Sequence, residues 1–425
     1  MILSYFKKSV QGDSMKPVID IHEHIFRGRD IPLKGYLYSR KYTGFLNFVA
    51  RFLRLLSAIA RCIRRTQKNG KRGLLCRVLI WLACRFLGSG YRIWADILSL
   101  PDISDVMDEL DKTCKADKVD LYVPLMIDYE YWFKNTVDEP IDHQIDEIYR
   151  SIVLERKGKV HPFVAFDPAR ELAYRKRMPG PEGSREKYSS LEMVKDAIEN
   201  KGFIGVKLYP AIGYRPAGNS AVDKQRRKLF RKIKMERYSV FTGDEIDGVL
   251  DDLYRYCVKE QVPITTHCVS GGIEAYPDAS YDFGSPVFWQ PVLRKYPSLH
   301  VNLAHFGWTG KERYIKPDHD GNKPWVKEIC DMITMHRYLY TDAAHHGVTD
   351  PKPRKEFLND YPIMFADHGE VIKKKLMYGI DWHVFSKEKN YTQFKPEYIR
   401  LWKELGLYSD DELGLFLGGN AMEFL

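Results

Sequence analysis

The chain has 425 residues, of which 44% are hydrophobic and 29% charged, and these values exclude a disordered or fibrous protein. Its seven cysteines form an odd set without CxxC pairs, which argues against a disulfide framework or a thiolate zinc site and favours a reducing compartment. The net charge of +9 is concentrated in one stretch, because residues 31–95 contain many Lys and Arg but no Asp or Glu.

The N-terminal residues lack the charge pattern and the long apolar core of a secretory signal. The most apolar run, residues 78–84, lies between two arginines and is far shorter than the roughly 20 residues that a membrane-spanning helix needs. The sequence therefore predicts a soluble, cytoplasmic protein.

Short hydrophobic runs recur along the chain and are typical of strands buried on both faces of a parallel sheet. Segments with helical patterning separate them. The predicted strands lie at residues 18–24, 119–128, 160–168, 203–210, 262–268, 300–307, 339–346 and 376–383. Eight strands alternating with helices predict an α/β fold of the (β/α)8 TIM barrel type, formed as a single domain by residues 1–425. An open doubly wound sheet is the alternative that the same alternation allows.

Two connections are unusually long. Residues 31–100 interrupt the first strand-to-helix connection, and residues 211–243 enlarge the fourth. Since every such connection of a parallel barrel emerges at the C-terminal face, where active sites lie, we expect both insertions to overhang the active site. The first is expected to form a helical cap.

Six polar side chains fall near the C-terminal ends of five predicted strands. They are His22, His24, Lys207, His267, His305 and Asp381. Side chains two residues apart share a face of a strand, so His22 and His24 are expected to point into the barrel, with Ile19 and Ile21 towards the helices. The same alternation places Lys207 and Asp381 inside, and it permits but does not require His267 and His305 there.

A barrel interior cannot hold four imidazoles, a lysine and a carboxylate without compensation, because burying such groups unpaired costs several kcal/mol each. A divalent metal compensates them, since neutral imidazoles and a carboxylate are typical ligands of zinc and its neighbours. The alternative is a polar core whose groups satisfy one another. We expect a metal site, with zinc as the first candidate and manganese or iron as others.

Several of these segments resemble a known family. The DIHEH, GVKLYP, THC, NLAHFG and YGIDW segments and the terminal FLGGNAMEFL are similar to the amidohydrolase superfamily, in the amidohydrolase-related branch that includes aminocarboxymuconate-semialdehyde decarboxylase-like enzymes. The resemblance covers nearly the whole chain outside residues 31–100.

The resemblance implies roles for the six side chains. His22, His24, His267 and Asp381 would bind one metal, and Asp381 would also accept a proton from water. His305 would polarise the substrate or bind a second metal. Lys207 matches a position that is carbamylated and bridges two metals in binuclear members, and a plain lysine that contacts substrate is the alternative.

The loop after the fourth predicted strand adds Tyr209, Tyr214 and Arg215 near the expected mouth of the barrel. Arg215 could hold a substrate carboxylate through two parallel hydrogen bonds, or it is an ordinary solvated arginine. His345 and His346 end the seventh predicted strand, and one of the two could face the cavity.

The basic insertion contains a predicted amphipathic helix at residues 44–65 and a second apolar segment beyond it. A helical hairpin that caps the barrel or packs against a second subunit in a homodimer is one interpretation, and peripheral membrane contact through residues 44–87 is the other. Together with the basic residues 224–234, this charge favours a small anionic substrate. Nucleic acid is not expected, because no recognition motif accompanies the charge.

The sequence thus predicts a metal-dependent hydrolase in which an activated water attacks a carbonyl-type bond of an amide, ester or lactone. Non-oxidative decarboxylation at the same metal is the alternative within enzymes. A catalytically inactive, membrane-associated scaffold is the alternative from a different class of protein.

Overall fold

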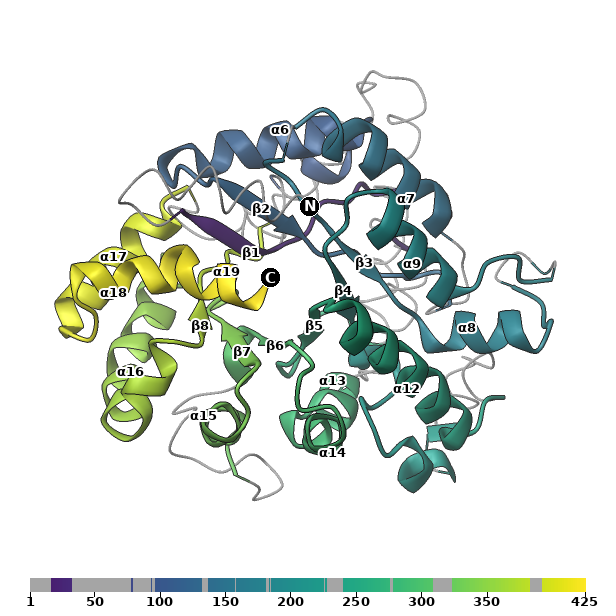
Figure 1. Cartoon of the computed structure of the whole chain (residues 1–425). Coiled ribbons are helices and arrows are strands. Elements are labelled where there is room, and N and C mark those ends of the chain that lie inside the picture. The colour runs from purple at the N-terminus through teal and green to yellow at the C-terminus, as the bar shows by residue number, and fades with distance from the viewer. Residues whose placement is uncertain are drawn as a thin grey trace.

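The computed structural model describes residues 17–32, 78, 93, 96–131, 137–156, 158–180, 183, 185–224, 226–227, 240–275, 278–308, 323–382 and 392–425. Within them, parallel strands lie in the middle of the molecule and helices surround them (Figure 1). The strands are β1 (Ile19–Glu23), β2 (Leu121–Pro124), β3 (Phe163–Ala165), β4 (Gly205–Leu208), β5 (Ile264–His267), β6 (Val301–Ala304), β7 (Leu339–Asp342) and β8 (Leu376–Met377).

The helices follow the strands in alternation, as the sequence pattern predicts. They are α6 (Ile103–Thr113), α7 (Ile141–Ile148), α8 (Pro168–Arg175), α9 (Ser190–Asn200), α12 (Gly243–Glu260), α13 (Ala279–Gly284), α14 (Gln290–Lys295), α15 (Trp325–Met335), α16 (Pro351–Ile372), α17 (Phe394–Leu405), α18 (Asp410–Gly414) and α19 (Asn420–Phe424). Their starts use familiar N-terminal signals. For example, Thr242 and Glu245 form a capping box at α12, which satisfies main-chain N–H groups that have no partner within the helix.

The strands close into a barrel. β1 pairs with β2, and β3 to β8 pair in sequence order, all in parallel. Isolated parallel bridges, Tyr122 with Val160 and Leu125 with Phe163, join the two sheets on one side. On the other side, the Ile21 N–H donates to the Tyr378 carbonyl at 3.2 Å. The structure therefore confirms the predicted (β/α)8 barrel.

The C-terminal helix α19 covers the N-terminal end of the barrel. The Phe424 ring lies 6.2 Å from the ring of Phe163 and 5.5 Å from that of Tyr340, centroid to centroid, and its carbonyl oxygen accepts a hydrogen bond from the His300 ring just before β6. In Figure 1 the C-terminus accordingly lies among the strands. This end is thus filled, and the functional side chains are left to the opposite end.

One orientation predicted from strand alternation is wrong. Ile19 and Ile21 do not face the surrounding helices but pack in a cluster with side chains of the other strands and of α19, including Phe163 and Phe424. The pairing register of β1 shifts between Asp20 and Glu23, so a strict two-residue alternation does not hold along this strand. The predicted strands are also longer than the observed ones, because residues at one or both of their ends lie outside the sheet.

The expected insertions fall mostly outside the described residues. Of residues 31–100, only the two ends and two isolated positions are described, so the cap, the homodimer contact and the membrane contact through residues 44–87 stay predictions. The loop of residues 211–243 begins with short helical turns at Pro210–Ile212 and Asn219–Val222, and most of its basic part lies outside the described residues as well.

Gly205 of β4 leaves room for an aromatic ring of the neighbouring strand. A Cβ atom on this residue would lie 2.3 Å from the ring of Phe163, its partner in β3. We expect Gly205→Ala to lower the free energy of unfolding by about 1–3 kcal/mol, because a buried ring must move. Denaturant unfolding checks this. Gly248→Ala, where the Cβ would meet nothing within 4 Å, is the control, and equal stability of the two variants would contradict the prediction.

A buried ionic cluster fixes the chain after β2. The Arg170 guanidinium at the start of α8 contacts the carboxylates of Asp128 (2.6 Å), Glu130 (2.9 Å) and Glu186 (3.2 Å). Since three carboxylates share one cation, the cluster carries excess negative charge. Burial, opposed by Arg170, raises the pKa of Glu130 to about 7 from an ordinary value of 4.5.

This shift predicts a pH-dependent stability. The raised pKa means that the fold favours protonated Glu130, so its contribution is fully present below about pH 4.5 and is lost as the pH rises through 7. Glu130→Gln should therefore be more stable than the parent at pH 8 by on the order of 1–3 kcal/mol, and by much less at pH 5. Thermal unfolding at both pH values, with the exposed Glu192→Gln as control, measures this. A difference that does not change with pH would contradict it.

Candidate active site

The structure brings the six predicted side chains together at the C-terminal end of the barrel. His22 belongs to β1 and His24 follows it, His267 is the last residue of β5, and His305 follows β6 directly. Lys207 comes from β4, and Asp381 comes from the segment after β8. Each of the six is at most 7% exposed, so the cluster is enclosed by the protein.

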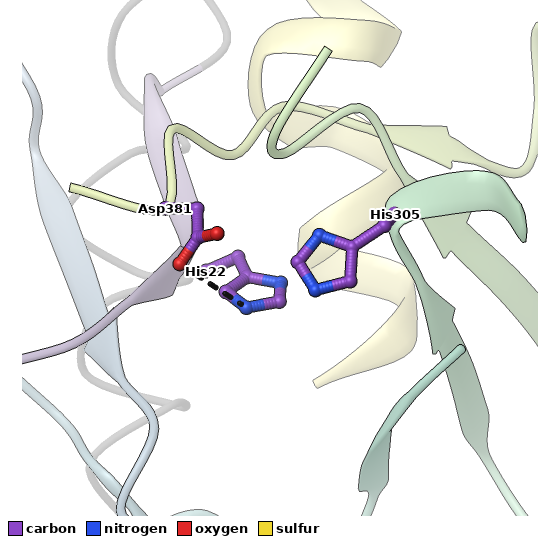
Figure 2. A group of neighbouring side chains, drawn as sticks. All are labelled: His22, His305 and Asp381. Atoms are coloured by element: carbon purple, nitrogen blue, oxygen red, sulfur yellow. Dashed lines mark ion pairs between the residues drawn. The ribbon is translucent and has the colours of Figure 1, made fainter. Parts of the chain in front are cut away.

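His22, His305 and Asp381 form the most compact part of this cluster (Figure 2). One ligand atom from each lies within 4.8 Å of the other two. The Asp381 Oδ1 atom is 3.9 Å from His22 Nε2 and 3.5 Å from His24 Nε2. His267 joins through its Nδ1 atom, which is 3.2 Å from His305 Nε2.

Hydrogen bonds on the far side of each ring orient the imidazoles. His24 Nδ1 donates to the Leu125 carbonyl (2.8 Å), His305 Nδ1 to the Ala344 carbonyl (3.2 Å) and His267 Nε2 to the Gly271 carbonyl (3.1 Å). A carbonyl oxygen only accepts, so each of these nitrogens carries the ring proton. The other nitrogen of each ring is left with a lone pair, which is the arrangement of imidazoles that bind metal.

The contact between His267 and His305 fits a shared cation. The two nitrogens that face each other at 3.2 Å both carry lone pairs. Burial lowers the pKa of His267 to about 3 and that of His305 well below its ordinary value, so a proton does not bridge them at neutral pH. Two nitrogens bound to one tetrahedral zinc at about 2.0–2.1 Å lie roughly 3.3 Å apart, which fits the observed distance.

Three buried polar atoms of the cluster have no hydrogen-bond partner among the described residues. They are His22 Nε2, Asp381 Oδ1 and Lys207 Nζ. Leaving such atoms unpaired costs about 1–3 kcal/mol each, and more where they are charged. His22 Nε2 and Asp381 Oδ1 face each other across 3.9 Å. An imidazole nitrogen and a carboxylate oxygen are typical ligands of a divalent metal. The residues present therefore fit a metal ion.

Asp381 is the only carboxylate among the six. Burial disfavours its charge, but the hydrogen bond from His345 Nδ1 to Oδ2 (3.0 Å) and the neighbouring imidazoles outweigh burial and lower its pKa to about 2. Asp381 is thus ionised at neutral pH with Oδ1 turned to the imidazoles. His345 is the histidine of the His345–His346 pair that reaches the site, and its side chain is 46% exposed.

His346, in contrast, is a structural residue. It is buried, its Nε2 contacts the His305 carbonyl at 3.2 Å, and the Tyr361 hydroxyl contacts its Nδ1 at 3.0 Å. Its ring stacks on Trp308 with centroids 4.6 Å apart. His346 therefore supports the turn that carries His305 and does not face the cavity.

The backbone is strained where it carries the site. His305 and His345 have φ of +66° and Asp381 has φ of +63°, in the left-handed region that residues other than glycine rarely adopt. Each such residue costs of order 1–3 kcal/mol, and residues of this kind are concentrated at functional sites. This strain falls on His305 and Asp381, which are buried in the cluster, and on His345, which hydrogen-bonds to Asp381.

Sequence reasoning missed Asp342, the last residue of β7. Its Oδ2 accepts from His22 Nδ1 at 3.1 Å and from Asn302 at 2.7 Å, and its Oδ1 accepts from the His305 N–H at 2.9 Å. Burial opposes its charge, but His22 and these hydrogen bonds lower its pKa. Its position near the end of a predicted strand, in the segment LYTDAAHH, is the feature of the sequence that could have identified it.

Lys207 lies beside the imidazoles as predicted. It is 1% exposed, and burial, partly offset by Asp342 and Asp381, lowers its pKa to about 8. It faces Thr265 of β5 across the sheet register, next to the strand that ends in His267. A lysine in this state alternates between an ammonium that attracts anions and a neutral amine.

The three predicted substrate contacts have different surroundings. Tyr209 stacks on His267 with ring centroids 4.5 Å apart, and its hydroxyl accepts from the Ile273 N–H. Tyr214 is 0% exposed and its hydroxyl accepts from the Tyr209 N–H, so it supports Tyr209, and its contact with a substrate stays a prediction. Arg215 packs over the Phe288 ring at 4.0 Å, and its role stays a prediction.

The chain belongs to the amidohydrolase family. The family model Amidohydro_2, described as amidohydrolase, matches residues 126–425, which include His267, His305 and Asp381 but not β1. This membership confirms the resemblance and makes the protein an enzyme of the amidohydrolase type, with a general metal-dependent function. The inactive scaffold is therefore set aside. No match was found among curated proteins.

Solved structures similar to this chain include amidohydrolases and a TIM-barrel protein. An amidohydrolase from Burkholderia multivorans with bound HEPES has 10% identity over 96% of this chain and 98% of that chain, with a TM-score of 0.50. A second structure of an amidohydrolase from Burkholderia multivorans, with bound zinc, has 11% identity over 96% of this chain and 98% of that chain, with a TM-score of 0.47. An uncharacterised TIM-barrel protein from Bordetella bronchiseptica has 17% identity, again with 96% and 98% coverage, and a TM-score of 0.47.

Among the described residues, no helix combines the length and the apolarity that crossing a bilayer demands.

Proposed function

We propose that this enzyme hydrolyses a carbonyl-type bond of a small anionic substrate, with zinc bound at the cluster. The observation that carries the proposal is the group of His22, His305 and Asp381, whose ligand atoms lie within 4.8 Å of one another, with two of them buried and unpaired. His24 and His267 stand within 3.5 Å of members of that group and complete the ligand set. Nitrogen and carboxylate ligands of this kind favour zinc.

A divalent ion bound here would polarise a carbonyl oxygen and lower the pKa of a water molecule to about 7. Asp381 supplies the proton acceptor, because it is ionised at neutral pH and its Oδ1 has no protein partner among the described residues. The hydrogen bond from His345 to Oδ2 holds the carboxylate with Oδ1 towards the imidazoles that would bind the ion. Returning the proton from Asp381 to the leaving group completes the cycle.

The anionic substrate is supported by the charge of the cluster. Lys207 is a cation with an unpaired Nζ atom among the imidazoles, and no other lysine or arginine among the described residues is placed this way. A substrate carboxylate would supply the missing partner. Carbamylation of Lys207 would remove this cation and create a ligand for a second ion, so the proposal commits to a plain lysine and a mononuclear centre.

One experiment separates hydrolysis from decarboxylation. The zinc-loaded enzyme is incubated in ¹⁸O-labelled water with carboxylate-bearing lactones, amides and esters, and with carboxylic acids that could lose CO2. Hydrolysis places one ¹⁸O atom in the product carboxylate without gas release. Release of CO2 from a substrate whose product contains no ¹⁸O would overturn the proposal in favour of decarboxylation.

A further inference from the structure

The barrel closes irregularly beside the metal centre. β8 has only two residues, and both pair with β7, while the register of β1 shifts between Asp20 and Glu23. The regular ladder is therefore interrupted where β1 meets the segment after β8. The Asp381 N–H still donates to the His22 carbonyl at 2.8 Å, which connects two of the proposed ligands through the main chain.

Two buried carboxyl side chains of β1 satisfy the main chain at this junction. Asp20 Oδ1 accepts from the Ile380 N–H at 3.2 Å and from the His22 N–H at 3.3 Å. Glu23 Oε2 accepts from the Trp382 N–H at 2.9 Å. The hydrogen bonds thus hold the peptide groups on both sides of Asp381, and Asp20 and Glu23 are both 0% exposed.

These contacts bear on the strain at Asp381. A φ of +63° costs an ordinary residue about 1–2 kcal/mol and persists only where the surroundings enforce it. Hydrogen bonds at residues 380, 381 and 382 fix three successive N–H groups, and the partners of all three lie in β1. The direction in which Asp381 presents its carboxylate is therefore set from β1, the strand that carries His22.

Core stability alone does not account for these carboxyls. Asp20 Oδ2 and Glu23 Oε1 have no partner in the described part of the chain apart from each other, and burying carboxyls in this way is costly. Apolar side chains of similar size would fill the space without that cost. What apolar side chains cannot do is accept the hydrogen bonds from the main chain on both sides of Asp381.

We propose that Asp20 and Glu23 are positioning residues of the metal centre, which hold His22 and Asp381 in register by accepting hydrogen bonds from the main chain around them. This inference rests on the proposed metal site. The acceptor oxygens of Asp20 and Glu23 are required for this positioning, whereas the negative charge of the two side chains is not.

The test compares variants that keep or remove the acceptor oxygen. Glu23→Gln and Asp20→Asn keep it, whereas Glu23→Met and Asp20→Leu replace it with apolar groups of similar size. Zinc affinity is measured by chelator competition, and the geometry at the metal is followed by the visible spectrum of the cobalt-substituted protein. Asp117→Asn is the matched control, because this buried carboxylate bonds to the Tyr378 hydroxyl and the Lys395 main chain instead.

We expect the two apolar variants to bind zinc about 10- to 100-fold more weakly and to shift the cobalt spectrum. The two amide variants and the control should bind zinc with an affinity within about threefold of the parent's. Their cobalt spectra should match that of the parent. Parent-like affinity and spectrum in folded Glu23→Met and Asp20→Leu would overturn the inference. Failure of the parent itself to bind metal would instead refute the proposed function.

A measurement on the parent protein decides the matter if the apolar variants do not fold. Amide hydrogen exchange should show slow exchange at Ile380 and Trp382, whose N–H groups donate to Asp20 and Glu23. Fast exchange at both amides in the folded, zinc-loaded protein would overturn the inference.

Discussion

Replacing His22 with alanine should weaken zinc binding by about 30- to 150-fold. Apparent zinc-binding free energies of about 10–16 kcal/mol shared among the five proposed ligands give roughly 2–3 kcal/mol for each. The far-side partner of His22 is also a carboxylate where the other three imidazoles have carbonyls: Asp342 accepts from its Nδ1 atom and leaves Nε2 facing Asp381. Chelator competition and metal content per chain measure the loss.

The zinc affinities of two further variants can be compared with that of His22→Ala. Asp342→Asn should weaken zinc binding by about 10- to 100-fold, because it disturbs the partner of His22 and not the ligand itself. His161→Ala is the matched control, since His161 is also buried but bonds to the Gly202 carbonyl away from the cluster. An unchanged zinc affinity in His22→Ala, or an equal loss in His161→Ala, would contradict the account.

Replacing Asp381 with asparagine should lower kcat by about 10²- to 10⁴-fold while zinc remains bound. The amide keeps an oxygen towards the imidazoles, but it cannot accept a proton from water as the ionised carboxylate does. The substrate is the one found with ¹⁸O-labelled water, and zinc content and circular dichroism are compared with the parent. A variant that holds zinc and retains more than about a tenth of parent kcat would show that another group accepts the proton.

The fold could be predicted from the sequence because its signals are repeated. Eight hydrophobic runs separated by helical segments leave few arrangements, and the closing contacts between β8 and β1 agree with the expected barrel. The direction of Ile19 and Ile21 could not be predicted, because one shift of register in β1 reverses the alternation. Such a shift depends on what β1 pairs with, and its own residues do not reveal it.

The metal-facing residues could be predicted because each lies at or near the C-terminal end of a strand of a parallel barrel, where five strands far apart in sequence converge. Their supporting residues were harder to find. Asp342 and Glu23 look like ordinary acidic residues in the sequence, and only the geometry shows that they bond to His22 and to the main chain beside Asp381. The full burial of Tyr214 could not be predicted either, because its loop position near the mouth does not show what packs around it.

Anomalous diffraction from crystals of the zinc-loaded enzyme, recorded at the zinc edge, tests the central claim most directly. The account predicts a peak inside the barrel, about 2.0–2.2 Å from His22 Nε2 and Asp381 Oδ1, with imidazoles from the same cluster completing the coordination. A zinc peak elsewhere would contradict this claim. So would the absence of any peak in a crystal where His22 and Asp381 lie as they do in this structure.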